Sequence, residues 1–82
     1  MKNTTNAITN ALIAQGIRKI GYDEINDSVF GDRIFVTVEK KDREKAEMVL
    51  NTILTKVERC ESTTTYKTNN NRIFLKPCYT EM

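Results

Sequence analysis

The 82-residue sequence contains no histidine, one proline, two cysteines and three glycines. Without histidine, the chain lacks the commonest general base of enzymes and the usual nitrogen ligand of zinc. Its glycines form no phosphate-binding loop motif. No apolar run approaches the roughly 20 residues that span a bilayer, and the first six residues lack the apolar core of a secretion signal. We therefore expect a cytoplasmic protein that is not an enzyme and that uses no metal, cofactor or membrane.

The two thiols, Cys60 and Cys78, are too few for a zinc site in one chain without histidine. In a reducing compartment both would stay reduced, as half-buried residues at strand ends. Alternatively they form a cross-strand disulfide, which requires a hairpin register that turns both thiols to one face of the sheet. The sequence leaves both interpretations open and favours the first.

Four acidic residues surround one predicted turn: Asp23, Glu24, Asp27 and Asp32. Several converging carboxylates could hold a divalent cation. These residues do not have the spacing of an EF-hand loop, so we expect ordinary surface acids around a hairpin.

Length and charge limit the classes of protein that fit. The chain is a single domain over residues 1–82, and such a domain buries roughly 60–65% of its unfolded surface, so an oligomer partner would help its stability. A net charge of +2 is mild for a dedicated nucleic-acid binder. Abundant lysine, asparagine and isoleucine are typical of proteins from AT-rich genomes, such as those of many bacteria and phages.

The tripeptide Arg-Ile-Phe occurs twice, at residues 33–35 and 72–74, each time after an apolar helical segment and a turn-prone gap. The chain therefore reads as two repeat-like halves, about residues 4–39 and 42–78, each a helix followed by two strands. We predict an α+β fold of order αββαββ, with possible internal duplication. Its four-stranded antiparallel sheet would carry both helices on one face.

Two glycines decide how the first half is built. Gly16 either interrupts a longer helix, or ends a helix in the left-handed conformation so that a strand runs from Ile17 to about Ile25. We favour the second interpretation. A two-residue hairpin at Gly31-Asp32 would place Asp27 on the apolar face, which argues for a longer loop from residue 26 to residue 32.

In the second half, an apolar stripe from Ala46 to Val57 predicts the second helix. A Thr-rich third strand is predicted from Cys60 to Thr68, and the segments 33–39 and 72–76 alternate as strands do. We expect Leu50→Ala to unfold the domain. The predicted core consists of the apolar residues that face the helices: Leu12, Ile34, Val36, Val38, Val49, Leu50, Ile53, Ile73 and Leu75.

Because the apolar neighbours of Phe35 and Phe74 must face the helices, the pleat turns both rings to the other face of the sheet. Ile20 and Tyr22 would join them there if Gly16 ends the first helix. The predicted binding residues are the aromatic and cationic side chains of this outer face: Phe35, Phe74, Arg33, Arg72, Lys76 and Tyr22.

Two functions fit such a face. In the first, a small non-enzymatic protein binds a protein partner or forms a homodimer, since exposed apolar patches usually mark interfaces. A phage or mobile-element accessory protein, such as an inhibitor of a host factor, would suit the size and composition. In the second, the face binds single-stranded nucleic acid, because aromatic rings stack on bases while cations contact phosphates. The modest net charge favours the first.

Overall fold

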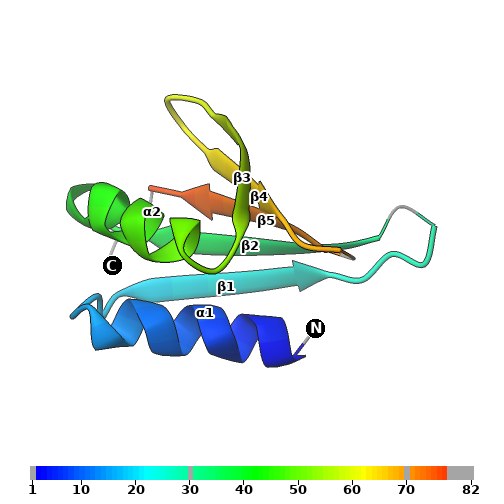
Figure 1. Ribbon diagram of the computed structural model, residues 1–82, viewed down its shortest axis with the longest axis horizontal. Helices are drawn as coiled ribbons and strands as arrows, with labels where there is room; N and C mark the ends of the chain where they lie inside the picture. Colours follow the sequence, from blue (N-terminus) through cyan, green and yellow to red (C-terminus); the bar gives the residue numbers. More distant parts are fainter. Residues whose placement is uncertain (1, 30, 70, 78–82) are drawn as a thin grey trace.

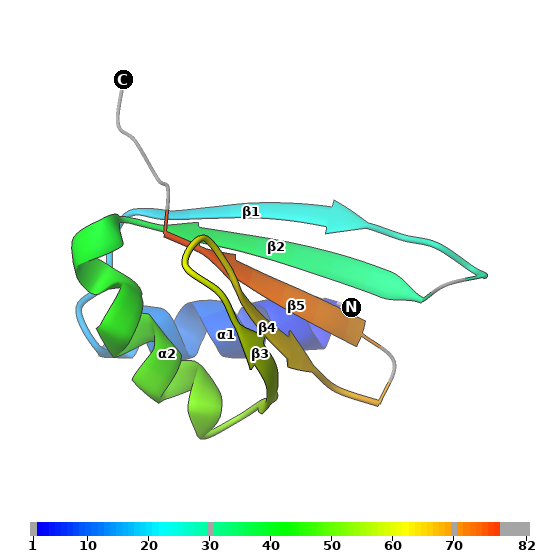
Figure 2. The same cartoon turned by 90° about the horizontal axis from the view of Figure 1, so that it is seen from above.

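The computed structural model describes residues 2–29, 31–69 and 71–77, and its two α-helices lie on one face of a five-stranded sheet (Figures 1 and 2). The predicted α+β class is confirmed. In chain order the elements are α1 (Lys2–Ala14), β1 (Ile20–Ile25), β2 (Asp32–Val38), the 3₁₀ turn η1 (Lys40–Asp42), α2 (Arg43–Asn51), β3 (Thr55–Arg59), β4 (Thr64–Lys67) and β5 (Asn71–Lys76).

The strand order is β1-β2-β5-β4-β3, and β2 runs parallel to β5 while the other neighbours are antiparallel. The prediction of four antiparallel strands is therefore wrong in strand number and in one pairing. Parallel neighbours need a long crossover connection. Here α2 and the β3–β4 hairpin together supply it (Figure 2).

The additional strand arises because α2 ends at Asn51, and β3 begins at Thr55. The predicted helix to Val57 is too long at its end, and the predicted strand from Cys60 to Thr68 is present only as β4, Thr64–Lys67. Residues 52–57 are rich in β-branched side chains, which pack well on a pleated surface and are weaker helix formers. Val57 lies where the β3–β4 register shifts, and its side chain is exposed.

The parallel pairing sets the two Arg-Ile-Phe copies side by side. Arg33 is opposite Arg72 in the register, and Phe35 is opposite Phe74. An antiparallel pair would reverse one copy relative to the other, so the parallel direction is what lets identical residues meet. At the centre of the sheet, the two Arg residues, the two Ile residues and the two Phe residues of the repeat are therefore direct neighbours.

Helix α1 ends before Gly16, which takes the left-handed conformation, as the favoured interpretation of the sequence predicted. This glycine has a φ of 86°, and its N–H donates to the Ile13 carbonyl at 2.9 Å. The Ile17 N–H donates to the Leu12 carbonyl at 3.1 Å, which closes the helix with a left-handed terminus. The strand begins later than predicted, at Ile20, and Ile17 is buried between the two elements.

A long loop joins β1 to β2, as predicted, because the last ladder pair is Ile25 with Arg33. Asp27 organises this loop: its carboxylate accepts from the Val29 N–H at 2.8 Å, and its carbonyl accepts from the Gly31 N–H at 3.0 Å. Val29 is 78% exposed on the loop. Phe30 lies outside the described residues.

The core lies between the sheet and the two helices. Most of the predicted core residues are fully buried there, and Val49 is partly buried against them. Ile53 is 45% exposed, so its prediction is wrong; it follows the end of α2 and no longer lies on the helix stripe. The buried apolar residues are Ile8, Leu12, Ile17, Ile34, Val36, Val38, Ala46, Leu50, Tyr66, Ile73 and Leu75.

Candidate binding face of the sheet

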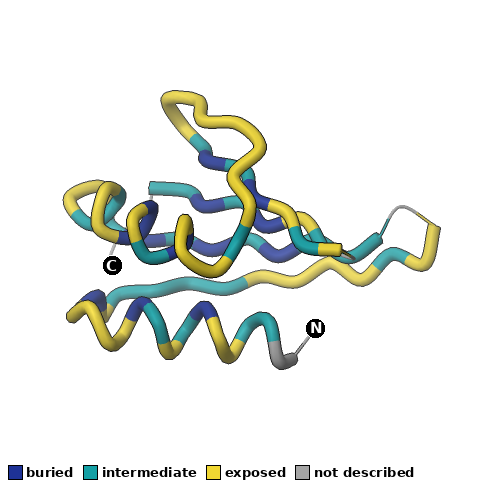
Figure 3. The backbone as a smooth tube through the Cα atoms, in the orientation of Figure 1, coloured by how far each residue is buried: buried dark blue, intermediate teal, exposed yellow. Residues whose placement is uncertain are grey.

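Both helices pack on the same side of the sheet, so neither lies on its other side (Figure 2). Along β2 and β5, buried residues alternate with partly exposed ones, which places the second set on that other side (Figure 3). We call this side the open face. By strand register it comprises Gly21, Asp23 and Ile25 of β1; Arg33, Phe35 and Thr37 of β2; Arg72, Phe74 and Lys76 of β5; Thr65 and Lys67 of β4; and Thr55 and Glu58 of β3.

An aromatic pair occupies the middle of the open face. The ring centroids of Phe35 and Phe74 are 5.0 Å apart with an interplanar angle of 17°. Coplanar rings lying side by side could not approach so closely, so the two rings overlap face to face. The Lys76 ammonium lies 5.1 Å from the Phe35 centroid, within range of a cation–π contact. Both rings are therefore partly buried by each other and remain at the surface.

A row of cations crosses the same strands beside the rings. Arg33, Arg72 and Lys67 are directly opposite one another on β2, β5 and β4. Like charges in such positions destabilise a sheet. Among the described residues, no carboxylate lies within 4.0 Å of Arg72 or Lys67, while Arg33 reaches the Asp27 carboxylate at 4.0 Å. A bound anion would relieve this repulsion.

The carboxylates of the open face lie on its edge strands. Asp23 of β1 is opposite Phe35, and Glu58 of β3 is opposite Thr65. The cations, in contrast, lie on the three inner strands β2, β5 and β4. The face is thus positive along its centre and negative at its margins, which favours an anion placed over the central strands.

Tyr22 does not belong to the open face, so its predicted place among the outer-face residues is wrong. It is opposite the buried Val36, and directly opposed residues of an antiparallel pair share a face. Its phenol oxygen accepts a hydrogen bond from Thr9 of α1 at 2.7 Å. Burial raises the pKa of Tyr22, and the Thr9 hydrogen bond opposes that rise. Ile20, opposite the buried Val38, likewise faces the helices.

The structure brings together the other predicted binding residues and adds Lys67, which the sequence interpretation missed. Along β4, Thr64 and Tyr66 are buried while Thr65 and Lys67 alternate with them. Recognising Tyr66 as a core residue would have assigned Lys67 to the open face. The Thr-rich composition of this segment concealed that alternation.

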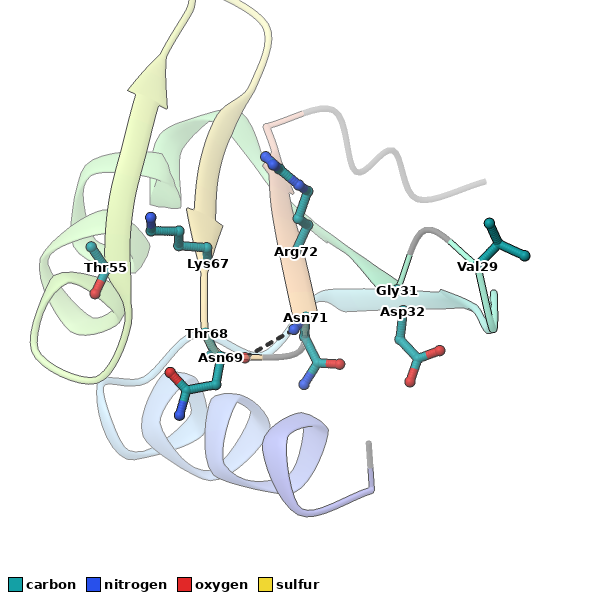
Figure 4. Close-up of a pocket in the computed structure, with 9 residues that line it drawn as sticks. All are labelled: Val29, Gly31, Asp32, Thr55, Lys67, Thr68, Asn69, Asn71 and Arg72. Atoms are coloured by element: carbon teal, nitrogen blue, oxygen red, sulfur yellow. Dashed lines mark hydrogen bonds between the residues drawn. The ribbon is translucent and has the colours of Figure 1, made fainter.

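A hollow lies at the end of the sheet where β4 turns into β5. Lys67 and Arg72 of the cation row line it together with Thr55, and Asn69 and Asn71 contribute amides (Figure 4). The Asn71 N–H donates to the Thr68 hydroxyl at 3.2 Å, which shapes the turn (Figure 4). The lining is mainly polar and holds two cations and one carboxylate, that of Asp32, with Val29 as its one apolar side chain.

On the helix side, a buried carboxylate joins α2 to the β3–β4 hairpin. Glu47 accepts hydrogen bonds from the Arg59 guanidinium at 2.8 Å and from the Thr64 hydroxyl at 2.6 Å. Burial raises the pKa of Glu47, but the hydrogen bonds from Arg59 and Thr64 and the nearby positive charges outweigh that effect and lower it. Arg43 donates to the backbone carbonyls of Cys60 and Glu61. This cluster therefore has a clear role in holding the hairpin in place.

The four acids considered as a cation site do not converge. Asp23 and Glu24 are consecutive on β1 and point to opposite faces, while the Asp32 carboxylate accepts from the Asp27 N–H within the loop at 3.2 Å. In the described ranges, no group of three or more histidines, cysteines or carboxylates gathers as a metal site. The same ranges include no helix of sufficient length and apolarity to cross a membrane.

Cys60 is exposed in the turn after β3, where its N–H donates to the Thr63 carbonyl at 2.8 Å. Its thiol donates to the Glu58 carboxylate, which raises the pKa of Cys60. A raised pKa leaves less of the reactive thiolate. Cys78 lies outside the described residues, so the disulfide alternative stays a prediction.

No protein-family model matches the chain, and neither a characterised protein nor a solved structure shows significant similarity to it.

Proposed function

We propose that the chain is a non-catalytic binding protein that takes a negatively charged macromolecule on its open face. The observation that carries this proposal is the row of Arg33, Arg72 and Lys67 across three neighbouring strands. Side chains of like charge in directly opposed positions cost stability in the free protein. That cost is offset when an anionic partner lies over the row.

The charge of the open face disfavours a homodimer formed through it. Two copies meeting face to face would bring the central cations of one against those of the other, since the carboxylates lie only at the margins. Repulsion of this kind suppresses a wrong partner. The partner is therefore a different molecule: an acidic segment of another protein, such as a host factor, or a nucleic acid.

Binding to simple polyanions tests the proposal. Arg72→Gln/Lys67→Gln removes two cations from the row. Lys40→Gln/Lys41→Gln is its matched control, because it changes the net charge equally on η1, at the opposite end of β2. Fluorescence anisotropy with labelled heparin fragments and labelled polyglutamate at low salt measures the affinity of each variant.

We expect the parent and the η1 control to bind at least one polyanion, and the Arg72/Lys67 variant to bind it roughly tenfold more weakly or worse. Circular dichroism verifies that both variants are folded. Equal affinities for the two charge variants would show that the open face is not the anion-binding surface.

A further inference from the structure

The aromatic pair distinguishes among anionic partners. Phe35 and Phe74 form a face-to-face stack with a centroid separation of 5.0 Å, and they remain at the surface of the sheet. A third flat ring can extend such a stack, because aromatic faces attract one another in offset arrangements. Nucleic-acid bases are flat rings of this kind, and every base has a face that can stack. An acidic peptide would use the cations but has no comparable group for the rings.

The distance between rings and cations fits a nucleotide. Along β5, Arg72 precedes Phe74 by two residues and Lys76 follows it by two. Two residues of a strand span about 6.6–6.8 Å. Cations therefore flank the rings on both sides at a distance that matches the separation of a base from its own phosphates. The guanidinium of Arg72 is also suited to bind a phosphate through two nitrogens.

The hollow described above adjoins the cation row and extends the polar surface of the open face beyond it. Lys67 and Arg72 belong both to the cation row and to the lining of the hollow, where Thr55, Asn69 and Asn71 add hydroxyl and amide groups (Figure 4). Hydroxyl and amide side chains bind sugars, phosphates and the edges of bases. A strand that crosses the Phe pair with its phosphates along the cation row would therefore enter a pocket with cationic, hydroxyl and amide partners on the side of Lys67 and Arg72, while the Asp32 carboxylate disfavours a phosphate beside it.

From these placements we propose that the occupant of the open face is a single-stranded nucleic acid. Its bases stack on the pair of Phe35 and Phe74, and its phosphates lie along Arg33, Arg72 and Lys67. A duplex keeps its bases stacked on each other and out of reach of the rings, so the single-stranded form is preferred. This inference rests on the proposed function, since it names the anionic partner of the same face.

The test compares three labelled probes of similar length: a single-stranded oligothymidine of about 12 nucleotides, a duplex of the same length and a heparin fragment. Phe35→Leu/Phe74→Leu keeps apolar bulk and removes both rings. We expect the parent to bind the single strand more tightly than the duplex. We expect the Leu variant to lose roughly tenfold or more of its affinity for the single strand, and to bind heparin as the parent does.

A measurement on the parent protein covers the case in which the Leu variant fails to fold. On addition of the oligothymidine, the NMR signals of the Phe35 and Phe74 ring protons should move upfield, because a stacked base shields them. Heparin should leave these signals near their original positions.

The outcomes separate this inference from the proposed function. If heparin or polyglutamate binds while the single strand is not preferred over the duplex, or the ring protons do not shift, the inference is overturned and an acidic protein partner remains. If none of the polyanions binds the parent, both proposals fail together.

Discussion

Tyr66 is the largest fully buried side chain of the core, and its hydroxyl has no hydrogen-bond partner among the described residues. Burial, reinforced by the negative charge of Glu47, raises the pKa of Tyr66 to about 12. A buried hydroxyl without a partner costs stability, because it loses its hydrogen bonds to water on folding. The apolar part of the ring, in contrast, contributes favourably to the core.

We predict that Tyr66→Phe leaves the free energy of unfolding unchanged or raises it by about 1 kcal/mol. Above pH 10 the unfolded chain releases the phenol proton, whereas the folded chain retains it up to about pH 12. Stability of the parent must therefore fall over this range, and the advantage of the Phe variant must grow. Urea unfolding of both proteins at pH 7 and at several values between pH 10 and pH 12 measures this difference in the free energy of unfolding. A large loss of stability in the variant would mean that the hydroxyl has a partner.

Leu50 tests the position of the core. It is fully buried on α2, and Leu50→Ala is expected to cost about 2–5 kcal/mol. The control is Met48→Ala on the same helix, because Met48 is 71% exposed and its truncation should change stability by less than about 0.5 kcal/mol. Thermal melts of the two variants should therefore differ widely. Similar melting temperatures would contradict the assignment of Leu50 to the core.

Individual side chains were predictable where strand alternation was clear. The pattern of residues 33–38 and 72–76 correctly placed both Phe residues away from the buried Ile and Val positions. Tyr22 was misplaced because its direction depends on which residue of β2 it opposes, and that register is set by tertiary packing. Lys67 was missed because β4 is short and Thr-rich, so its alternation of buried and exposed residues is hard to recognise in the sequence.

The attachment of α2 to the β3–β4 hairpin depends on Glu47. Its carboxylate is buried and holds Arg59 and Thr64, so its ionised form is stabilised in the folded protein. A pKa below the ordinary value of 4.5 means that the contribution to stability is present above that pH. The contribution is lost as the pH falls through the folded-state pKa.

We predict that Glu47→Gln lowers the melting temperature at pH 7 by roughly 5 °C or more, because Arg59 loses its carboxylate partner. The difference from the parent should shrink as the pH falls below about 4.5. Glu44→Gln, on the exposed face of the same helix, is the matched control and should have little effect. An equal loss at pH 3 and pH 7 would show that the ionised carboxylate is not responsible.

The β3–β4 hairpin also shows where element prediction from sequence fails. The apolar stripe from Ala46 to Val57 matches a helical period, yet only its first part is helical. Local propensity favoured the strand through several β-branched residues, and pairing with β4 completed it. The parallel pairing of β2 with β5 depends on the crossover through α2, β3 and β4, and no short sequence pattern predicts that connection.

For the molecule as a whole, the packing of both helices on one side of the sheet was predictable from the sequence. This packing leaves the open face uncovered, and the proposed function depends on that face. The apolar stripes of two amphipathic helices cover one face of this small sheet, which leaves the other face to carry polar and aromatic residues. The repeated Arg-Ile-Phe predicted two similar strands. That they are neighbours in register, and so double both the rings and the cations, is a property of the tertiary fold.

The charge of the open face predicts that the protein is monomeric at low salt. Size-exclusion chromatography with light scattering should give the mass of a single chain. A dimer that Phe35→Ser/Phe74→Ser converts to a folded monomer would instead show that two copies bind through the rings, as the first sequence hypothesis allowed.

The salt dependence of binding tests the central claim, that the cation row contacts an anionic chain, most directly. For single-stranded nucleic acid, log K falls against log salt with a slope of about −0.7 for each phosphate contacted. The affinity of oligothymidine should be measured over a range of salt for the parent, for Arg72→Gln/Lys67→Gln and for the η1 control. We predict a steep slope for the parent and the control, and a slope shallower by about 1.4 for the Arg72/Lys67 variant. Identical slopes for all three proteins would contradict the account.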